Sequence, residues 1–175
     1  MNNIHIYIPV LAALAALLFA VMKYLLIMKQ DEGSGEMKDI AKMIQDGAFA
    51  FLKAEYTWLA FFVAFVFLAI AVSPAELGLG IRTSVAFLCG AVASGLAGLF
   101  GMHTATRAAV RTTQAATKSV QGALSVAFNS GLVMGFCVVG LGLVGISGLL
   151  LVYVGDGMVT ELILEQVLGF SFGAS

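Results

Sequence analysis

SVQGALSVAFNSGLVMGFCVVGLGLVGISGLLLVYVG, residues 119–155, decides the fold, because 37 consecutive positions carry no charged side chain. A helix needs about 20 apolar residues to cross the hydrocarbon core of a bilayer. This stretch is longer than that, so we place a complete membrane span at residues 125–154 and expect the turns before it to reach headgroups or water. Asp156 and Gly157 should form the turn that follows.

Other apolar runs lie on both sides of this span. Three complete ones precede it, at residues 6–28, 56–73 and 83–102, and a fifth opens near Leu162 and is incomplete at Ser175. We predict an all-α, polytopic transmembrane helix bundle with four complete spans plus the start of a fifth. Residues 1–175 are expected to be the N-terminal part of one integral membrane domain in a larger multi-span subunit.

The composition favours the same class. Hydrophobic residues make up 61% of the chain and charged residues 11%, whereas soluble domains are about 25% charged. The net charge is −1, and the charged residues lie outside the middles of the four spans. The sequence therefore predicts a lipid bilayer as a partner and gives no sign of a nucleic-acid-binding surface.

The basic residues are distributed unequally between the two sides of the membrane. Eight belong to the connections between spans one and two and between spans three and four: Lys23, Lys29, Lys38, Lys42, Lys53, Arg107, Arg111 and Lys118. Only Arg82 belongs to the other side. Because Lys and Arg favour the cytoplasmic side, we expect the N-terminus outside the cytoplasm, in the inner membrane if the protein is prokaryotic.

The connection before span two has helical periodicity of its own. Met37, Ile40, Ile44, Ala48 and Phe51 recur at helical spacing, with charged residues on other faces. No proline interrupts residues 36–72, so we predict one continuous helix there, about 55 Å long at 1.5 Å per residue. Residues 31–35 should form a flexible hinge before it, with the hydroxyl of residue 34 as the N-cap.

Small residues recur four apart in spans three and four. Gly90, Ser94 and Gly98 form one such ridge, and residues 127, 131 and 135 form the other. Small residues let helices approach closely in lipid. We therefore interpret both ridges as helix-packing surfaces rather than as transport machinery.

The four complete spans contain no acidic or basic residue at mid-membrane, where such a residue would be a functional candidate. No phosphate-binding loop and no paired-histidine zinc motif is present. His5 and His103 lie near span ends and are expected to be interfacial rather than ligands. Cys89 and Cys137 lie deep in apolar runs and are expected to be buried small hydrophobes. No residue of this chain is assigned a catalytic, cofactor-binding or metal-binding role.

Two charged groups leave an alternative open. Glu161 and Glu165 share a helix face before the fifth span, where they could line an ion exit. We favour a solvated helix start, because carboxylates suit the helix dipole there. Arg107, Arg111 and Lys118 form an acid-free basic cluster in the sequence. They could draw in an anionic substrate, but we favour anchoring at the cytoplasmic surface, which explains the same three residues without a ligand.

Four motifs in order resemble those of the membrane-bound, ion-translocating pyrophosphatases. They are IAKMIQDGAFAFLKAEY at residues 40–56, GMHTATRAAVRT at 101–112, GALSVAFNSGLVMG at 122–135 with GLGLVG at 140–145, and GFSFGAS at 169–175. They are similar to the second helix, the third-helix exit, the fourth helix and the start of the fifth helix in that family. One departure is Ala109, where the family usually has Asn.

The resemblance implies a homodimer that hydrolyses pyrophosphate on the cytoplasmic side with Mg²⁺ and moves H⁺ or Na⁺ outward. Spans one to four would belong to an outer ring, and the fifth would begin an inner ring around the substrate and the ion path. The aspartate-rich motifs that hold magnesium pyrophosphate in the family follow the point where this chain ends, so the chain alone should be inactive. Which ion is moved, and whether K⁺ activates the enzyme, would depend on residues farther along.

Two other functions compete with this interpretation. A non-enzymatic membrane transporter or channel fragment would share the spans, the ridges and the orientation. A complete small scaffold protein would share the composition. The ordered motifs argue against the first alternative, and the incomplete fifth span argues against the second.

Overall fold

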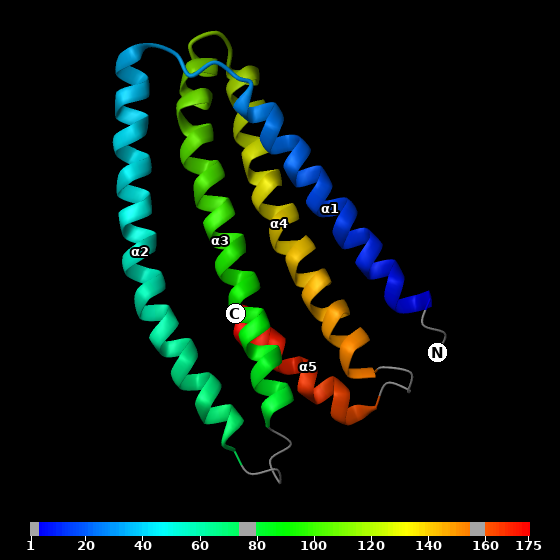
Figure 1. The fold of residues 1–175 in the computed structure, drawn as a ribbon. Coiled ribbons are helices and arrows are strands. Elements are labelled where there is room, and N and C mark those ends of the chain that lie inside the picture. Colours follow the sequence, from blue (N-terminus) through cyan, green and yellow to red (C-terminus); the bar gives the residue numbers. More distant parts are fainter. Residues whose placement is uncertain (1–3, 74–79, 155–159) are drawn as a thin grey trace.

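The computed structural model describes residues 4–73, 80–154 and 160–175, and within these ranges all regular secondary structure is helical (Figure 1). The helices are α1 (Ile4–Met28), α2 (Gly35–Ala71), α3 (Ile81–Ala116), α4 (Val120–Val154) and α5 (Glu161–Ala174). The first four are long and apolar enough to cross a membrane. The predicted all-α, polytopic helical bundle is therefore confirmed.

The four long helices lie side by side, with α2 on one flank and α1 on the other (Figure 1). Helix α3 is central, since it packs on α2, α4 and α5, while α1 packs mainly on α4. Helix α5 crosses α3 at the end of the bundle opposite the α1–α2 connection. The two loops that link α1 to α2 and α3 to α4 consequently meet at one end.

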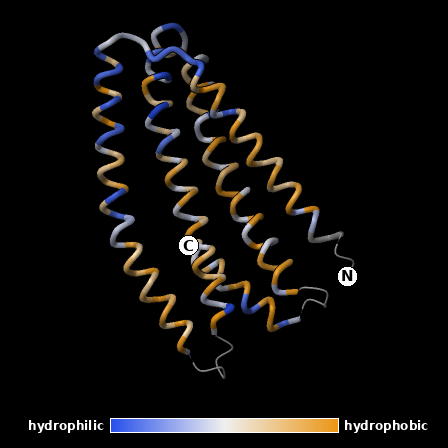
Figure 2. Tube along the Cα trace, viewed as in Figure 1, coloured by the Kyte–Doolittle hydropathy of each residue, from blue (hydrophilic) through white to orange (hydrophobic). Residues whose placement is uncertain are grey.

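Helix α2 is continuous, as predicted, and ends at Ala71, one residue before the expected end. It begins where expected, because the hydroxyl of Ser34 accepts a hydrogen bond from the backbone N–H of Met37 at 3.4 Å. One half of the helix is rich in polar residues and the other half is apolar (Figure 2). A single helix can therefore both cross the membrane and extend beyond it.

Helix α3 is much longer than the span predicted at residues 83–102, because it continues to Ala116. Arg107 and Arg111 therefore lie on a rigid helix beyond the span. Helix α4 contains the span predicted at 125–154, and α5 matches the segment predicted at 162–175. The turn predicted at residues 156–157 lies outside the described residues.

Two buried clusters connect the helices. One joins α1, α3 and α4, and its members are Ala20, Ile27, Ala108, Val126, Val133 and Cys137. The other joins α3, α4 and α5, and its members are Ala86, Leu149, Val167 and Phe170. Many large apolar side chains remain outside both clusters, such as Phe65 on α2 at 71% exposed. Such surface is unfavourable in water but suits a helix that faces lipid or further helices.

Glycines bring α3 and α5 into close contact. A Cβ atom at Gly90 would collide with the carbonyl oxygen of Phe170, and one at Gly173 would collide with that of Phe87. A Cβ at Gly98 would lie 2.9 Å from the hydroxyl of Tyr56 on α2. Two of the three residues of the span-three ridge thus pack as predicted, Gly90 on α5 and Gly98 on α2, whereas Ser94 between them is exposed.

The ridge predicted in span four does not pack within the described chain. A Cβ atom at Gly131 or Gly135 would have no neighbour within 4 Å, and Ala127 is exposed. The close contacts of α4 come from other glycines instead. Gly140 packs against Leu17 and the backbone of α1, and Gly145 packs against the ring of Phe170. Spacing alone identified small residues but not the face of the helix that is covered.

Candidate functional site at the charged end of the bundle

Hydrophilic residues concentrate at the end where the α1–α2 and α3–α4 connections meet (Figure 2). The α1–α2 connection crosses over α3, so its acidic residues come close to the basic residues of that helix. We call residues Asp31, Glu32 and Gly33 the clasp, because their contacts hold this connection on α3.

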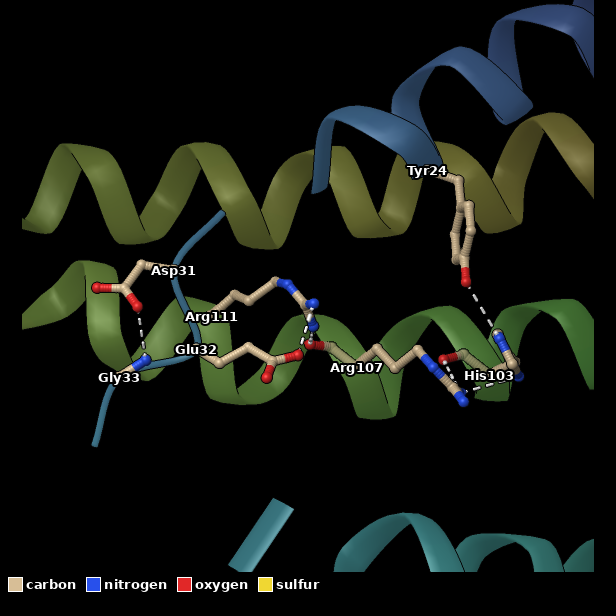
Figure 3. Close-up of polar contacts among 7 residues, drawn as sticks. All are labelled: Tyr24, Asp31, Glu32, Gly33, His103, Arg107 and Arg111. Atoms are coloured by element: carbon tan, nitrogen blue, oxygen red, sulfur yellow. Dashed lines mark hydrogen bonds and ion pairs between the residues drawn. The ribbon is translucent and has the colours of Figure 1, made fainter. Parts of the chain in front are cut away.

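The clasp is centred on a buried ion pair. The Nη2 atom of Arg111 donates a hydrogen bond to Oε1 of Glu32 at 2.7 Å (Figure 3). Its Nη1 atom donates to the backbone carbonyl of Arg107, also at 2.7 Å. The Arg111 side chain is only 7% exposed, whereas that of Glu32 is 41% exposed. Glu32 is therefore the counter-charge that makes a buried guanidinium tolerable at this position.

Asp31 forms the second half of the clasp. Its carboxylate accepts hydrogen bonds from the backbone N–H of Gly33 and from Nε2 of Gln114, both at 3.0 Å, and lies 3.8 Å from Nζ of Lys118. The Gly33 N–H and the Gln114 amide lower the pKa of Asp31, with the positive charge of Lys118 adding to the effect. Asp31 is consequently ionised. It ties the α1–α2 connection to the end of α3 through Gln114 and to the α3–α4 connection through Lys118.

The backbone conformation of the third member of the clasp favours glycine. Gly33 has a φ of +83°, a conformation that side chains disfavour. A Cβ atom there would also lie 2.8 Å from Oε1 of Gln114. The segment expected to be a flexible hinge therefore makes specific contacts with α3 in the folded chain.

The predicted acid-free basic cluster is not acid-free in the folded chain. Arg111 pairs with Glu32, and Lys118 lies within ion-pair distance of Asp31. The positive charges of Arg111 and Lys118 are thus offset locally, whereas Arg107, the third member of the cluster, contacts His103 instead of a carboxylate. The signal that sequence reasoning missed was the pair of acidic residues directly after span one.

His103 links three helices near the predicted end of span three. Its Nε2 atom lies 3.2 Å from the hydroxyl of Tyr24 on α1, and its Nδ1 atom lies 2.9 Å from Nη1 of Arg107 (Figure 3). The guanidinium can only donate, so Nδ1 accepts and the neutral ring donates from Nε2 to Tyr24. The His103 ring also packs edge-to-face with the ring of Phe49 on α2, with 6.1 Å between the ring centroids. His103 therefore has a packing role, while the His5 side chain lies outside the described residues.

The other predicted candidates lie apart from this end. Glu161 and Glu165 are exposed in the first turns of α5, which Thr160 caps by accepting from the N–H of Ile163. This arrangement favours a solvated helix start over an ion exit. Cys137 is buried as expected, but Cys89 is exposed, so that part of the cysteine prediction was wrong. Among the described residues, no three His, Cys, Asp or Glu side chains are grouped to hold a metal ion.

Ala109, the departure from the family pattern, lies on the side of α3 that faces α2. It lines a cavity of about 160 Å³ together with Met37, Ile40 and Ile44. Its neighbours are mainly apolar, so the methyl group fits this environment.

Known proteins and protein families of similar sequence indicate what kind of protein this chain comes from. Residues 14–175 match the model of a family described as inorganic H+ pyrophosphatase. A K(+)-insensitive pyrophosphate-energized proton pump of Methanosarcina mazei is 38% identical over 97% of this chain. A putative K(+)-stimulated pyrophosphate-energized sodium pump of Clostridium tetani is 43% identical over 77% of the chain.

A plant relative, the pyrophosphate-energized membrane proton pump 3 of Arabidopsis thaliana, is 36% identical over 85% of this chain. The chain spans 24%, 19% and 21% of the lengths of these three relatives, in the order given. The family match nevertheless covers all but the first 13 residues of the chain. This chain therefore belongs to the inorganic H+ pyrophosphatase family.

Proposed function

We propose that this chain contributes the first membrane helices of a pump that couples pyrophosphate hydrolysis to the transport of H⁺ or Na⁺. The observation that carries the proposal is the family match over residues 14–175. Both ions are included because a proton pump and a putative sodium pump each match most of the chain. The four long helices and the apolar surface of the bundle support an integral membrane location.

The proposed role of this part is to support the catalytic part rather than to bind substrate. Pyrophosphate with Mg²⁺ requires several carboxylates and cationic donors converging in one cavity. In the described part of the chain no three His, Cys, Asp or Glu side chains are grouped to hold a metal ion, and Asp31 and Glu32 hold the clasp. We therefore propose that the residues that hold Mg²⁺, and K⁺ where it activates, come from elsewhere in a longer homodimeric subunit, as the resemblance implies.

The clasped end of the bundle is proposed to face the cytoplasm, because eight of the nine basic residues belong to that side. A cysteine introduced by Thr117→Cys, at an exposed position in the α3–α4 connection, should react with an impermeant thiol reagent only from the cytoplasmic side. The measurement is labelling of intact cells against labelling of inside-out vesicles, in a background lacking other reactive cysteines. Labelling in intact cells would reverse the proposed orientation.

The function is tested with the full-length protein that contains this chain, reconstituted into liposomes. Addition of pyrophosphate and Mg²⁺ should release phosphate and move H⁺ or Na⁺, detected with a pH-sensitive dye and with ²²Na⁺. The 175-residue chain, reconstituted in the same way, is the control and should show neither activity. Ion movement without pyrophosphate would favour a non-enzymatic transporter, and hydrolysis by the chain alone would disprove the supporting role.

A further inference from the structure

An apolar cavity lies between α1, α3 and α4, beside the predicted membrane spans. Its volume is about 380 Å³, and its apolar lining includes Leu17, Val21, Phe100, Val133 and Leu141. A helix is about 10–12 Å across with its side chains, so the cavity is too small to hold another helix of the subunit. A single flexible hydrocarbon chain matches both its apolar lining and its size.

A polar cavity of about 400 Å³ lies on the other flank of α3, between α3 and the extended half of α2. Its charged lining residues are Glu32, Lys38, Lys42, Asp46 and Arg107. Glu32 is already paired with Arg111. The remaining lining charges are three positive and one negative, so this cavity favours an anionic group.

A pair of hydrogen-bonded side chains connects the two cavities. His103 lines the apolar cavity, Arg107 lines the polar one, and their side chains are joined at 2.9 Å. His103 directly follows the span predicted at residues 83–102, and Arg107 is one helical turn farther out. The change from apolar to cationic lining therefore occurs where hydrocarbon gives way to headgroups.

We propose that these cavities form one binding site for an anionic phospholipid of the leaflet at the clasped end of the bundle. One acyl chain would occupy the apolar cavity, and the headgroup phosphate would lie beside Arg107, Lys42 and Lys38. Basic pockets between membrane helices bind such headgroups in this way. The apolar cavity distinguishes a lipid from a soluble phosphate, which would have no use for it. The site is independent of the proposed pump activity.

The test uses native mass spectrometry of the full-length protein, delipidated in mild detergent and then titrated with phosphatidylglycerol or phosphatidylcholine. Wild type should bind one phosphatidylglycerol per subunit in preference to phosphatidylcholine. The double variant Lys42→Gln/Arg107→Gln should bind it on the order of tenfold more weakly. Its matched control is Lys23→Gln/Lys29→Gln, which removes the same charge at the same end from residues that line neither cavity.

A second pair of variants tests the acyl chain. Val21 lines the apolar cavity and is 55% exposed, so Val21→Trp should block the cavity without disturbing the core. Leu18→Trp, at a 73% exposed position outside the cavity, is its control and should bind lipid normally. Melting temperatures of all variants report whether they fold.

Three results would overturn the proposal. The first is equal binding of both phospholipids by wild type, which would mean that no anionic headgroup is selected. The second is unchanged phosphatidylglycerol binding after Val21→Trp, because no acyl chain then occupies the cavity. The third is full displacement of phosphatidylglycerol by millimolar inorganic phosphate, because a phosphate site without an acyl chain would then explain the binding.

Discussion

Replacing Gly173 by valine is expected to separate α5 from α3 and to destabilise the chain more than any other single substitution considered for these helices. A Cβ atom at this position would collide with the backbone carbonyl of Phe87 and lie 2.8 Å from the backbone nitrogen of Ala91. Backbone atoms of a packed helix cannot rotate away as a side chain can. Gly90 of α3 lies equally close to the backbone carbonyl of Phe170 of α5. A shift of α5 that relieved the collision at residue 173 would therefore disturb the close packing at Gly90.

The expected loss is about 3 kcal/mol, at the upper end of what overpacking usually costs. It can be measured as the change in unfolding free energy of the purified chain in detergent, with SDS as the denaturant. Gly131→Val is the matched control, because a Cβ atom there has no neighbour within 4 Å and the position is also helical. Equal losses in the two variants would show that valine in a helix, rather than the α3–α5 contact, causes the destabilisation.

The helices themselves could be predicted from the sequence because apolar length is a local property. Residues 119–155 lack any charge, and α4 occupies Val120–Val154 within them. The unbroken α2 followed from periodicity without proline. The extension of α3 to Ala116 was missed, since beyond Met102 its sequence mixes apolar, basic and threonine residues and no longer resembles a span. Hydropathy predicts the limits of a membrane span but not the end of the helix that contains it.

Tertiary contacts could be predicted less well, because they join residues far apart in the chain. Glu32 and Arg111 are 79 positions apart, and neither local sequence predicts that the two residues form an ion pair. The same separation joins Tyr24 to His103. The glycine ridges illustrate the same limit, since Gly90 and Gly131 have equivalent spacing, yet only Gly90 is covered. Local patterns therefore predicted the elements but not the charge neutralisation at the clasped end.

Because Glu32 neutralises the buried Arg111, we expect Glu32→Gln to cause the second large loss of stability. The variant leaves the Arg111 guanidinium buried without a counter-charge, and breaking a buried ion pair from one side costs about 3–5 kcal/mol. Because the Glu32 side chain is 41% exposed, water screens part of the interaction. We therefore expect a loss of about 2 kcal/mol, measured in the same SDS titration.

Removing the basic partner of the ion pair should destabilise the chain less than removing the acidic one. Arg111→Met removes the buried charge itself, fills a similar volume and leaves Glu32 able to regain water, so the expected loss is about 1 kcal/mol. The double variant should lose less than the sum of the single variants, with a coupling of about 1 kcal/mol. Glu36→Gln is the control, because Glu36 is exposed and belongs to neither ion pair of the clasp, and its change should be close to zero.

The asymmetry between the two single variants distinguishes the ion pair from simple packing. If the Arg111 side chain contributed only through its bulk, Glu32→Gln would have little effect, because the guanidinium would keep its position and its bond to the Arg107 carbonyl. Arg111→Met would then be the more damaging change, and the two variants would be additive. An ion pair that holds the α1–α2 connection on α3 requires the opposite order and a non-additive double variant.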